Sequence, residues 1–215
     1  MKAKIFIGLP IFRYYEFQMK HSLDDMILQA KNWEVGIYRE MFGESLISRA
    51  RNHFLDWFLE SDCSHLFFMD ADIVSYTLDA IDIMIADDLP IVAGAYVYKG
   101  YPLRPAFRIG KTNEDMADLR DKLIPIKARY VSAGFMLIRK DVALRVVDIG
   151  GFVPFYNNVE YLSEDWAFCD RARNKGFVCY IDPKIKLGHL GLYPFTMDDY
   201  YRIYIDKKGA RDELS

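Results

Sequence analysis

Two aspartates, Asp70 and Asp72, stand directly after four apolar residues, 66–69. The apolar run is typical of a buried strand, and residues two apart in extended backbone point to one side, so the two carboxylates can converge. Like charges held close raise each other's pKa and destabilise a site unless a cation joins them. Ligands bind open α/β sheets at such strand ends. The pattern therefore indicates a cation-dependent ligand site; a solvated turn, where aspartate is common, is the competing interpretation.

A polar helix face leads into this strand. The residues predicted to share that face at helical spacing are Ser45, Arg49, Asn52, His53 and Asp56, and the residues predicted on the opposite, core side are Leu46, Ala50, Phe54 and Trp57. Arg49 and Asn52 could therefore reach a ligand beside Asp70. An ordinary solvated polar face would show the same spacing.

Two later segments carry groups of similar chemistry. Glu164 and Asp165 begin a helix after Ser163. Acidic residues in a first turn complement the helix dipole, but either carboxylate could instead point into the site as a base or as a hydroxyl-binding group. His189 lies between Gly188 and Gly191. A lone histidine is usually structural, whereas a neutral imidazole with room around it would complete an oxygen-rich metal site.

The elements that must position these residues alternate in the first half of the chain. The predicted strands are Ala3–Leu9, Trp33–Arg39, His65–Met69 and Pro90–Val97, and the predicted helices are Phe17–Ala30, Leu46–Glu60 with Ser45 as N-cap, and Leu78–Asp87. This alternation predicts the α/β class, with a mostly parallel central sheet flanked by helices.

The second half is less regular. A loop with an edge strand is predicted for Lys99–Arg108, a polar exposed segment for Lys111–Lys122, a strand containing Gly134 for Tyr130–Arg139, a helix between Ser163 and Gly176 for Glu164–Lys175, short strands for Phe177–Ile181 and Ile185–Leu187, and an aromatic tail for Tyr193–Tyr204. No internal repeat or linker interrupts the chain, so we expect one domain over residues 1–215.

Composition sets further bounds. The chain has 215 residues, of which 52% are hydrophobic, and its net charge of −3 gives no general attraction to nucleic acid or to anionic membranes. Three cysteines, Cys63, Cys169 and Cys179, have no tight spacing, which predicts reduced thiols in a reducing compartment. Residues 2–12 are predicted as a strand and not as a signal peptide, and no transmembrane segment is expected. We therefore expect a cytoplasmic protein, or a domain of a longer chain.

Taken in order, these segments resemble the GT-A fold of nucleotide-sugar-dependent glycosyltransferases. The matching segments are Ile5–Pro10, Ser48–Asn52, Phe67–Asp72, Val131–Met136, Ser163–Trp166 and His189. Each motif is common by chance, and the joint order and spacing carry the resemblance. It implies a nucleotide-binding half over about residues 1–98 and a sugar and acceptor half over about residues 99–215.

The resemblance also implies roles for individual residues. For the nucleotide, Leu9 and Pro10 would lie near the base, and Arg49 or Arg51, with Asn52, would contact the nucleoside or diphosphate. Asp70 and Ala71 would lie near the ribose and metal, and Asp72 and His189 would bind the metal. Gly134 would line the sugar pocket, and Asp165, with Glu164, would be the candidate base or sugar-hydroxyl partner. Where many inverting relatives carry an Asp-Asp pair after the second strand, Tyr38 to Glu40 stand here. The uracil contacts therefore do not carry over.

The chemistry implied is metal-dependent transfer of a hexose or deoxyhexose from a UDP-sugar to a glycan or glycoprotein acceptor. A cation held by Asp72 and His189 would stabilise charge on the leaving diphosphate, and mixed carboxylate and imidazole ligands suit Mn²⁺, with Mg²⁺ as the alternative. Lys99 or Arg104 could add a positive clamp or simply be solvated. The sequence also resembles the compact glycosyltransferase domain of large algal viruses (chloroviruses) that builds capsid glycans. This implies UDP-rhamnose as a possible donor and the host cytoplasm as the location.

Two other functions remain open at the level of sequence. Asp70 to Val74 after an apolar strand resembles the first motif of haloacid-dehalogenase-type phosphatases, in which the first aspartate is the nucleophile. That family places the motif on its first strand and adds a Gly-Asp motif that this chain lacks. The second alternative is a non-catalytic module that binds a sugar or nucleotide through a structural metal. Inverting and retaining outcomes also both remain open.

Overall fold

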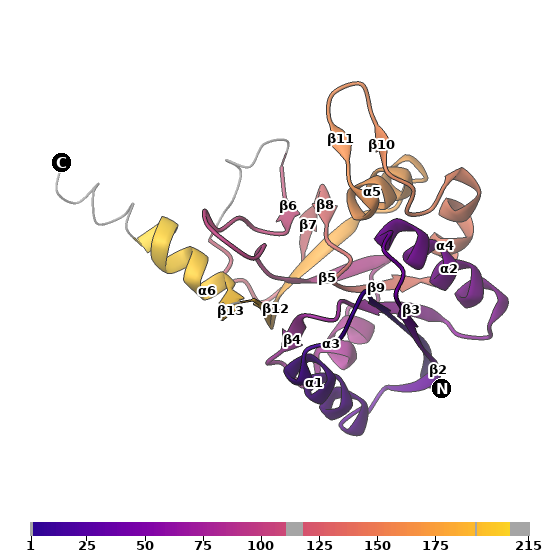
Figure 1. The fold of residues 1–215 in the computed structure, drawn as a ribbon, viewed down its shortest axis with the longest axis horizontal. Coiled ribbons are helices and arrows are strands. Elements are labelled where there is room, and N and C mark those ends of the chain that lie inside the picture. The colour runs from indigo at the N-terminus through magenta and orange to yellow at the C-terminus, as the bar shows by residue number, and fades with distance from the viewer. Residues whose placement is uncertain (1, 111–117, 192, 207–215) are drawn as a thin grey trace.

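The computed structural model describes residues 2–110, 118–191 and 193–206, and a nine-stranded sheet runs through its centre (Figure 1). The strands are β1 (Ala3–Ile11), β2 (Trp33–Phe42), β3 (His65–Met69), β4 (Ile73–Ser75), β5 (Ile91–Ala95), β6 (Phe107–Arg108), β7 (Ile126–Ala128), β8 (Tyr130–Val131), β9 (Phe135–Arg139), β10 (Phe155–Tyr156), β11 (Tyr161–Leu162), β12 (Cys179–Leu190) and β13 (Pro194–Thr196). The helices are α1 (Phe17–Leu28), α2 (Ile47–Glu60), α3 (Ala80–Ala86), α4 (Lys140–Val146), α5 (Glu164–Asn174) and α6 (Met197–Tyr200), with the helical turns η2 (Val147–Ile149) and η3 (Tyr201–Ile205).

The strand order is β13-β12-β5-β9-β3-β1-β2, and β4 and β7 pair with β12. Strand β1 is parallel to both β2 and β3, and β12 is parallel to β5. Strand β9 runs antiparallel between β3 and β5, which gives β2, β1, β3, β5 and β12 one common direction. The predicted α/β class with a mostly parallel sheet is confirmed. The carboxyl ends of these five strands therefore lie at one edge, where ligand sites form in such sheets.

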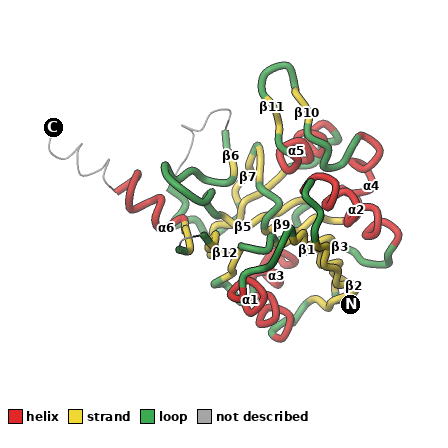
Figure 2. The backbone as a smooth tube through the Cα atoms, in the orientation of Figure 1, coloured by secondary structure: helices red, strands yellow, loops and turns green. Residues whose placement is uncertain are grey.

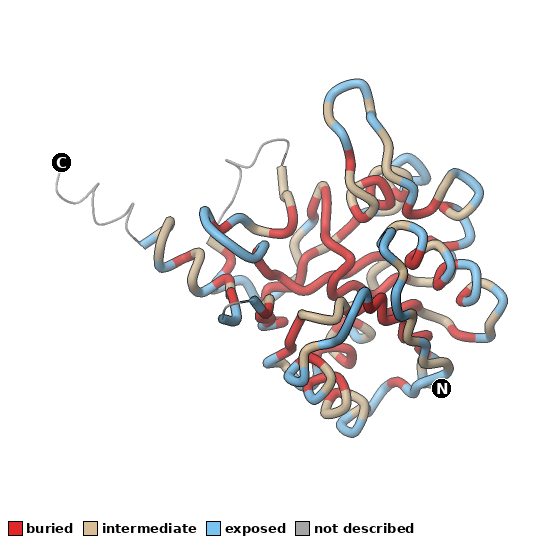
Figure 3. Tube along the Cα trace, in the orientation of Figure 1, coloured by how far each residue is buried: buried red, intermediate tan, exposed pale blue. Residues whose placement is uncertain are grey.

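Apolar side chains cover both faces of the sheet, which appears as the buried centre in Figure 3. Consecutive strand residues point to opposite faces, so Phe6 packs with the helices α2, α4 and α5, while Ile5 and Ile7 pack with α1 and α3. Figure 1 shows these two helical layers on either side of the strands. Two-sided burial explains why β1, β3 and β5 are apolar runs without polar alternation.

The structure corrects several predicted boundaries. Helix α2 has Leu46 and not Ser45 at its N-cap, and the predicted core residues Leu46 and Trp57 are exposed. The predicted strand over residues 130–139 is two strands, β8 and β9, and Gly134 lies in the turn between them. The two short strands predicted after α5 form one long strand, β12. Most of the polar segment predicted from residue 111 lies outside the described residues.

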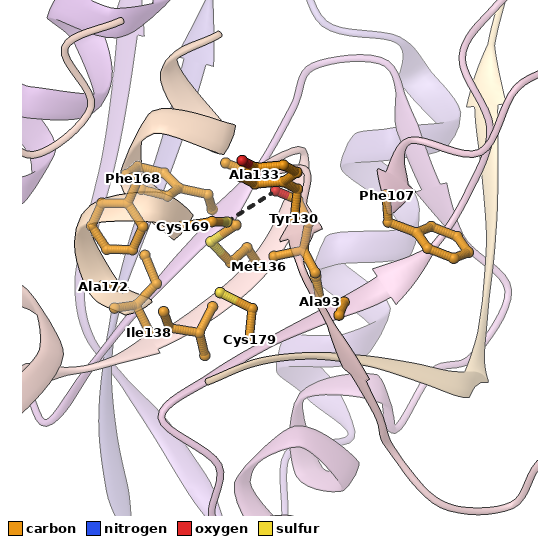
Figure 4. Packing of buried hydrophobic residues seen from close by; sticks show 14 of the residues in the cluster. Ala93, Phe107, Tyr130, Ala133, Met136, Ile138, Phe168, Cys169, Ala172 and Cys179 are labelled. Atoms are coloured by element: carbon orange, nitrogen blue, oxygen red, sulfur yellow. Dashed lines mark hydrogen bonds between the residues drawn. The ribbon is translucent and has the colours of Figure 1, made fainter. Parts of the chain in front are cut away.

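The three thiols of the chain lie inside the fold. Cys63, Cys169 and Cys179 are buried and free, and the last two lie in the packed core with Met136 and Phe168 (Figure 4). None of the helices in the described ranges is long and apolar enough to cross a membrane.

Candidate functional site

A tight turn follows β3 and carries the two predicted aspartates. The chain leaves the strand at Asp70, whose carbonyl accepts a hydrogen bond from the Ile73 N–H at 3.1 Å. Two further backbone bonds hold the turn: the Asp70 N–H donates to Gly134 O at 2.9 Å, and the Leu190 N–H donates to Asp72 O at 2.7 Å. The expectation of extended backbone here is therefore wrong. Asp70 and Asp72 line one cleft but face different partners.

Asp72 faces two nitrogen groups. The Lys99 ammonium forms an ion pair with its Oδ2, and His189 Nε2 lies 3.5 Å from its Oδ1. Burial alone would raise the pKa of Asp72, but the hydrogen bonds and charges of His189 and Lys99 lower it below its ordinary value. The His189 ring is fixed from behind, because its Nδ1 lies 2.9 Å from the carbonyl oxygen of Val97. A carbonyl only accepts, so Nδ1 carries a proton.

Asp70 is held by a buried arginine. The side chain of Arg51, 2% exposed, donates from Nη2 to Asp70 Oδ1 at 2.8 Å and from Nη1 to Glu164 Oε1. Burial opposes the charge of Arg51, but the facing carboxylates of Asp70 and Glu164 hold its pKa above the ordinary value. One guanidinium thus joins the end of β3 to the first turn of α5, 94 residues further along the chain than Asp70. Arg51 therefore positions Asp70 and Glu164.

The first turn of α5 presents the second acidic pair. Asp165 is 7% exposed, and its Oδ1 accepts hydrogen bonds from the Ser163 hydroxyl and, at 2.8 Å, from the Trp166 N–H. Burial, and in addition the charge of Asp165, raises the pKa of Glu164 against the opposing effect of Arg51. The hydroxyl of Ser163 thus fixes the rotamer of Asp165, whose Oδ2 takes no part in these two bonds.

Gly134 allows the close packing between these groups. A Cβ at this position would come within 2.9 Å of Asp70 Oδ2 and would also collide with the Tyr96 hydroxyl. Tyr96 is buried, and its ring meets the His189 imidazole edge to face, with 5.5 Å between the centroids. Gly134 is therefore required for the contact of Tyr96 with the Asp70 turn.

A cleft of about 340 Å³ opens over the turn. It lies over loops at the carboxyl ends of strands, which are green in Figure 2, and its lining residues are Pro10, Ile11, Phe12, Arg13, Tyr14, Glu16, Glu44, Ser45, Ile47, Asp70, Ala71, Asp72 and Lys99. The sequence analysis missed Phe12, Arg13 and Tyr14. The available signal was their place directly after Pro10, which marks the carboxyl end of a predicted strand. These three residues give the cleft two aromatic rings and a second cation.

The remaining predicted residues are placed as follows. Pro10 and Ala71 line the cleft, and Leu9 is fully buried beneath it. Arg49 is exposed and pairs with Glu44 at 2.5 Å. Asn52 Oδ1 accepts the backbone N–H of Phe152 at 2.8 Å, so its amide supports a neighbouring turn. Of the three polar groups predicted on α2, the structure thus brings Arg51 to Asp70, and not Arg49 or Asn52.

Asp72 and His189 are the side chains of the site that could bind a divalent cation. No three histidine, cysteine, aspartate or glutamate side chains converge within residues 2–110, 118–191 and 193–206. Asp72 and His189 do face each other, and because the Nδ1 of His189 carries a proton, loss of the Nε2 proton would leave a lone pair next to a carboxylate oxygen. Two acceptors at 3.5 Å require a cation or a proton between them. These two side chains fit a bound cation whose other ligands come from phosphate or water.

Comparison with known proteins supports the fold. No protein-family model matches the sequence, and no curated protein matches it. Among solved structures, the crystal structure of A197 from STIV aligns with a TM-score of 0.59 and 16% identity over 88% of this chain and 86% of that chain. The crystal structure of GalNAc-T7 with UDP, GalNAc and Mn²⁺ aligns with a TM-score of 0.54 and 9% identity over 89% of this chain.

The second alignment covers only 44% of the GalNAc-T7 chain, so similarity to that protein concerns one part of it. At 16% and 9% identity these alignments establish a common fold and leave the substrates open. The chain therefore has a GT-A-like α/β fold, with an acidic turn, a cationic side chain and a histidine gathered at the carboxyl edge of its sheet.

Proposed function

We propose that this chain is a metal-dependent glycosyltransferase that uses a nucleotide-sugar donor. The single observation that carries the proposal is the cleft at the end of β3 of a GT-A-like fold, where Asp72 and Lys99 line the wall and His189 lies against Asp72. Asp72 and His189 would hold Mn²⁺ or Mg²⁺, and the bound cation would supply Lewis-acid stabilisation of the leaving diphosphate. Lys99 would add a second positive charge next to the same phosphates.

The other residues divide the remaining work. Arg51 holds Asp70 in place beside the proposed metal ligands through its ion pair. Phe12 and Tyr14, which are 55% and 68% exposed, would cover the base of the nucleotide, since aromatic rings stack on nucleobases. At the first turn of α5, Asp165 or Glu164 would accept the proton of the acceptor hydroxyl in an inverting reaction. In a retaining reaction, either carboxylate would orient sugar hydroxyls.

The identity of donor and acceptor belongs to the proposal as well. We propose a UDP-sugar, with a hexose or a deoxyhexose such as rhamnose, and a glycan or glycoprotein acceptor such as a viral capsid glycan. The nucleotide-binding half would be residues 1–98 and the acceptor half residues 99–215. Free, buried thiols favour the cytoplasmic location predicted from the sequence.

The alternatives make different predictions in one experiment. Purified protein is incubated with a panel of nucleotide sugars, with Mn²⁺ or with chelator, and nucleotide release is measured. We expect hydrolysis of at least one UDP-sugar in Mn²⁺ only, and a loss of roughly 100-fold or more in Asp72→Asn. Asp56→Asn, an exposed residue on α2, is the matched control. Release of phosphate from a generic ester would favour the phosphatase, and binding without turnover would favour the non-catalytic module.

A further inference from the structure

A second cavity of about 340 Å³ lies apart from the cleft over the Asp70 turn, which is called the first cleft below. Its walls are the segment between β5 and β6, the start of α5, and the helix formed by α6 and η3, which lies beside that segment in Figure 1. None of the residues that line the first cleft lines the second. No function assigned above uses this cavity.

Aromatic side chains dominate its lining, with Tyr98, Trp166, Tyr200 and Tyr204 from three different elements. Tyr200 and Tyr204 lie with their centroids 5.2 Å apart at an angle of 37°, so they present two adjacent ring surfaces. The Trp166 indole N–H is buried and has no hydrogen-bond partner in the part of the chain that the structure describes. Within the described ranges, the lining contains Arg104 and no carboxylate. This surface combines apolar ring faces with the polar hydroxyl tips of three tyrosines, Tyr98, Tyr200 and Tyr204.

The second cavity adjoins the acidic groups of the site. Tyr98 lines it, whereas the next residue, Lys99, lines the first cleft and pairs with Asp72. Trp166 lines it as well and directly follows Asp165, whose Oδ1 it binds through its backbone N–H. Burial, and after it the charge of Asp165, raises the pKa of the Tyr98 phenol. A molecule in the second cavity therefore lies against Trp166, the residue next to Asp165, and against Tyr98, the residue next to Lys99 of the first cleft.

We propose that this aromatic cavity binds a pyranose ring of the acceptor glycan, with its hydroxyl rim turned toward Asp165 and its C–H face on Tyr200 and Tyr204. A pyranose matches the lining because it carries apolar C–H groups on a face and hydroxyls at the rim. That the saccharide is an acceptor rests on the proposed function, whereas its binding to this cavity requires neither a donor nor a metal. The chemistry assigns a neutral saccharide to the cavity, and neither an alkyl chain nor a peptide.

The test follows the three tryptophans, Trp33, Trp57 and Trp166, by fluorine NMR of the full chain carrying 5-fluorotryptophan. Trp33 lies in the core and Trp57 on α2, so Trp166 is the one that reports on the cavity; Trp166→Phe assigns its signal. The probes are the methyl glycosides of glucose, galactose, mannose, N-acetylglucosamine and rhamnose at millimolar concentration, without metal or nucleotide. We expect saturable shifts of the Trp166 signal with at least one glycoside and unchanged signals for Trp33 and Trp57.

Tyr204→Ala should weaken that glycoside by roughly two- to tenfold, the loss expected for one aromatic contact, and should leave UDP affinity unchanged. The matched control is Tyr161→Ala, an exposed tyrosine on β11 that lies outside the cavity. The proposal is overturned if no glycoside moves the Trp166 signal, or if hexanol or a tyrosine-containing tripeptide moves it at lower concentration than every glycoside does.

Failure of this inference can be told apart from failure of the proposed function. Metal-dependent hydrolysis of a UDP-sugar without any glycoside effect on Trp166 would overturn the acceptor cavity alone. Glycoside binding at Trp166 in a protein that neither binds UDP nor hydrolyses any nucleotide sugar would leave a saccharide-binding cavity and remove the transferase.

Discussion

Lys99 and His189 approach the carboxylate of Asp72 at its two different oxygens. The ammonium of Lys99 is 41% exposed at the side-chain level, so it can leave this ion pair at small cost, unlike the buried pair of Arg51. A divalent cation would compete with the Lys99 ammonium for the negative charge of the Asp72 carboxylate. Once a diphosphate is bound, the two cations would instead share a partner with more negative charge than one carboxylate.

This competition predicts opposite effects in Lys99→Met. In the absence of nucleotide, Mn²⁺ should bind up to roughly fivefold more tightly, because the ammonium no longer occupies Asp72. In the presence of saturating Mn²⁺, UDP should bind more weakly, because one cation beside its phosphates is gone. Calorimetric titration measures both, with the exposed Lys127→Met as control. Changes of the same sign in both titrations would show that Lys99 does not exchange between the two partners.

Arg51 acts at the scale of elements, because its two ion pairs tie α2 to the end of β3 and to the first turn of α5. Removal of one partner from a buried ion network leaves charges without compensation, which costs about 3–5 kcal/mol. We therefore expect Arg51→Met to lower the free energy of unfolding by about that amount in urea denaturation. Arg49→Met removes an exposed pair two residues away on the same helix, and it should leave stability nearly unchanged. Similar effects of both substitutions would contradict the structural role of Arg51.

The elements also show how far the sequence determines this fold. The early strands and helices were predicted within a few residues, since long apolar runs and helical periodicity identify β1, α1, β2, α2 and β3. Strands of two or three residues, such as β6 and β7, have no such local pattern and are fixed by pairing with the distant strands β8 and β12. Gly134 was expected inside a strand, but its backbone approaches Asp70 from a turn.

The site residues also divide into those that local sequence patterns identify and those that only distant contacts fix. The acidic turn, the first turn of α5 and His189 could be identified from residue type and spacing. The helical pattern of α2 favoured Arg49, because Arg51 flanks the buried positions Ala50 and Phe54. A buried arginine is stable only when carboxylates reach it, and one of these comes from Glu164, which no local pattern connects to α2. Long-range charge pairing is therefore the information that the sequence alone did not supply.

At the scale of the whole molecule, an acidic pair far from the cleft makes stability depend on pH. Asp87, at the end of α3, faces the fully buried Asp182 of β12, and the Lys184 ammonium lies 3.5 Å from Asp87 Oδ1 and 3.3 Å from Asp182 Oδ2. Burial and the charge of Asp182 raise the pKa of Asp87 to about 6, although Lys184 opposes the shift. Between about pH 4 and pH 6, the folded chain thus holds a proton that the unfolded chain has lost.

The sign of the effect follows from the raised pKa. The contribution of the protonated Asp87 is complete below about pH 4 and is lost as the pH rises through about 6. Asp87→Asn should remove this dependence and should raise stability at pH 7.5, by about 1 kcal/mol once solvent screening is allowed for. Urea midpoints between pH 4 and pH 8 measure it. Asp88→Asn, the exposed neighbour, is the control; a wild-type pH profile that persists in Asp87→Asn would assign the titration elsewhere.

In the proposed function, metal and nucleotide both bind at the acidic turn, so the binding of each should depend on the other. A diphosphate placed beside Asp70 and Asp72 is repelled by them, and a cation between the groups reverses the sign of the interaction. Linkage then requires that UDP and Mn²⁺ strengthen each other's binding by one common factor, and about 1–3 kcal/mol, or roughly 5- to 150-fold, is typical of such coupling.

Thermal unfolding measures this coupling directly. UDP alone should raise the melting temperature little, Mn²⁺ alone modestly, and both together by more than the sum of the two. His189→Ala should reduce the excess without abolishing it, since Asp72 remains, and Asp56→Asn should leave it unchanged. If UDP stabilises the protein equally in Mn²⁺ and in excess chelator, then no metal ion bridges the diphosphate to Asp72, and the positive charge next to the phosphates comes from side chains of the cleft such as Lys99 and Arg13.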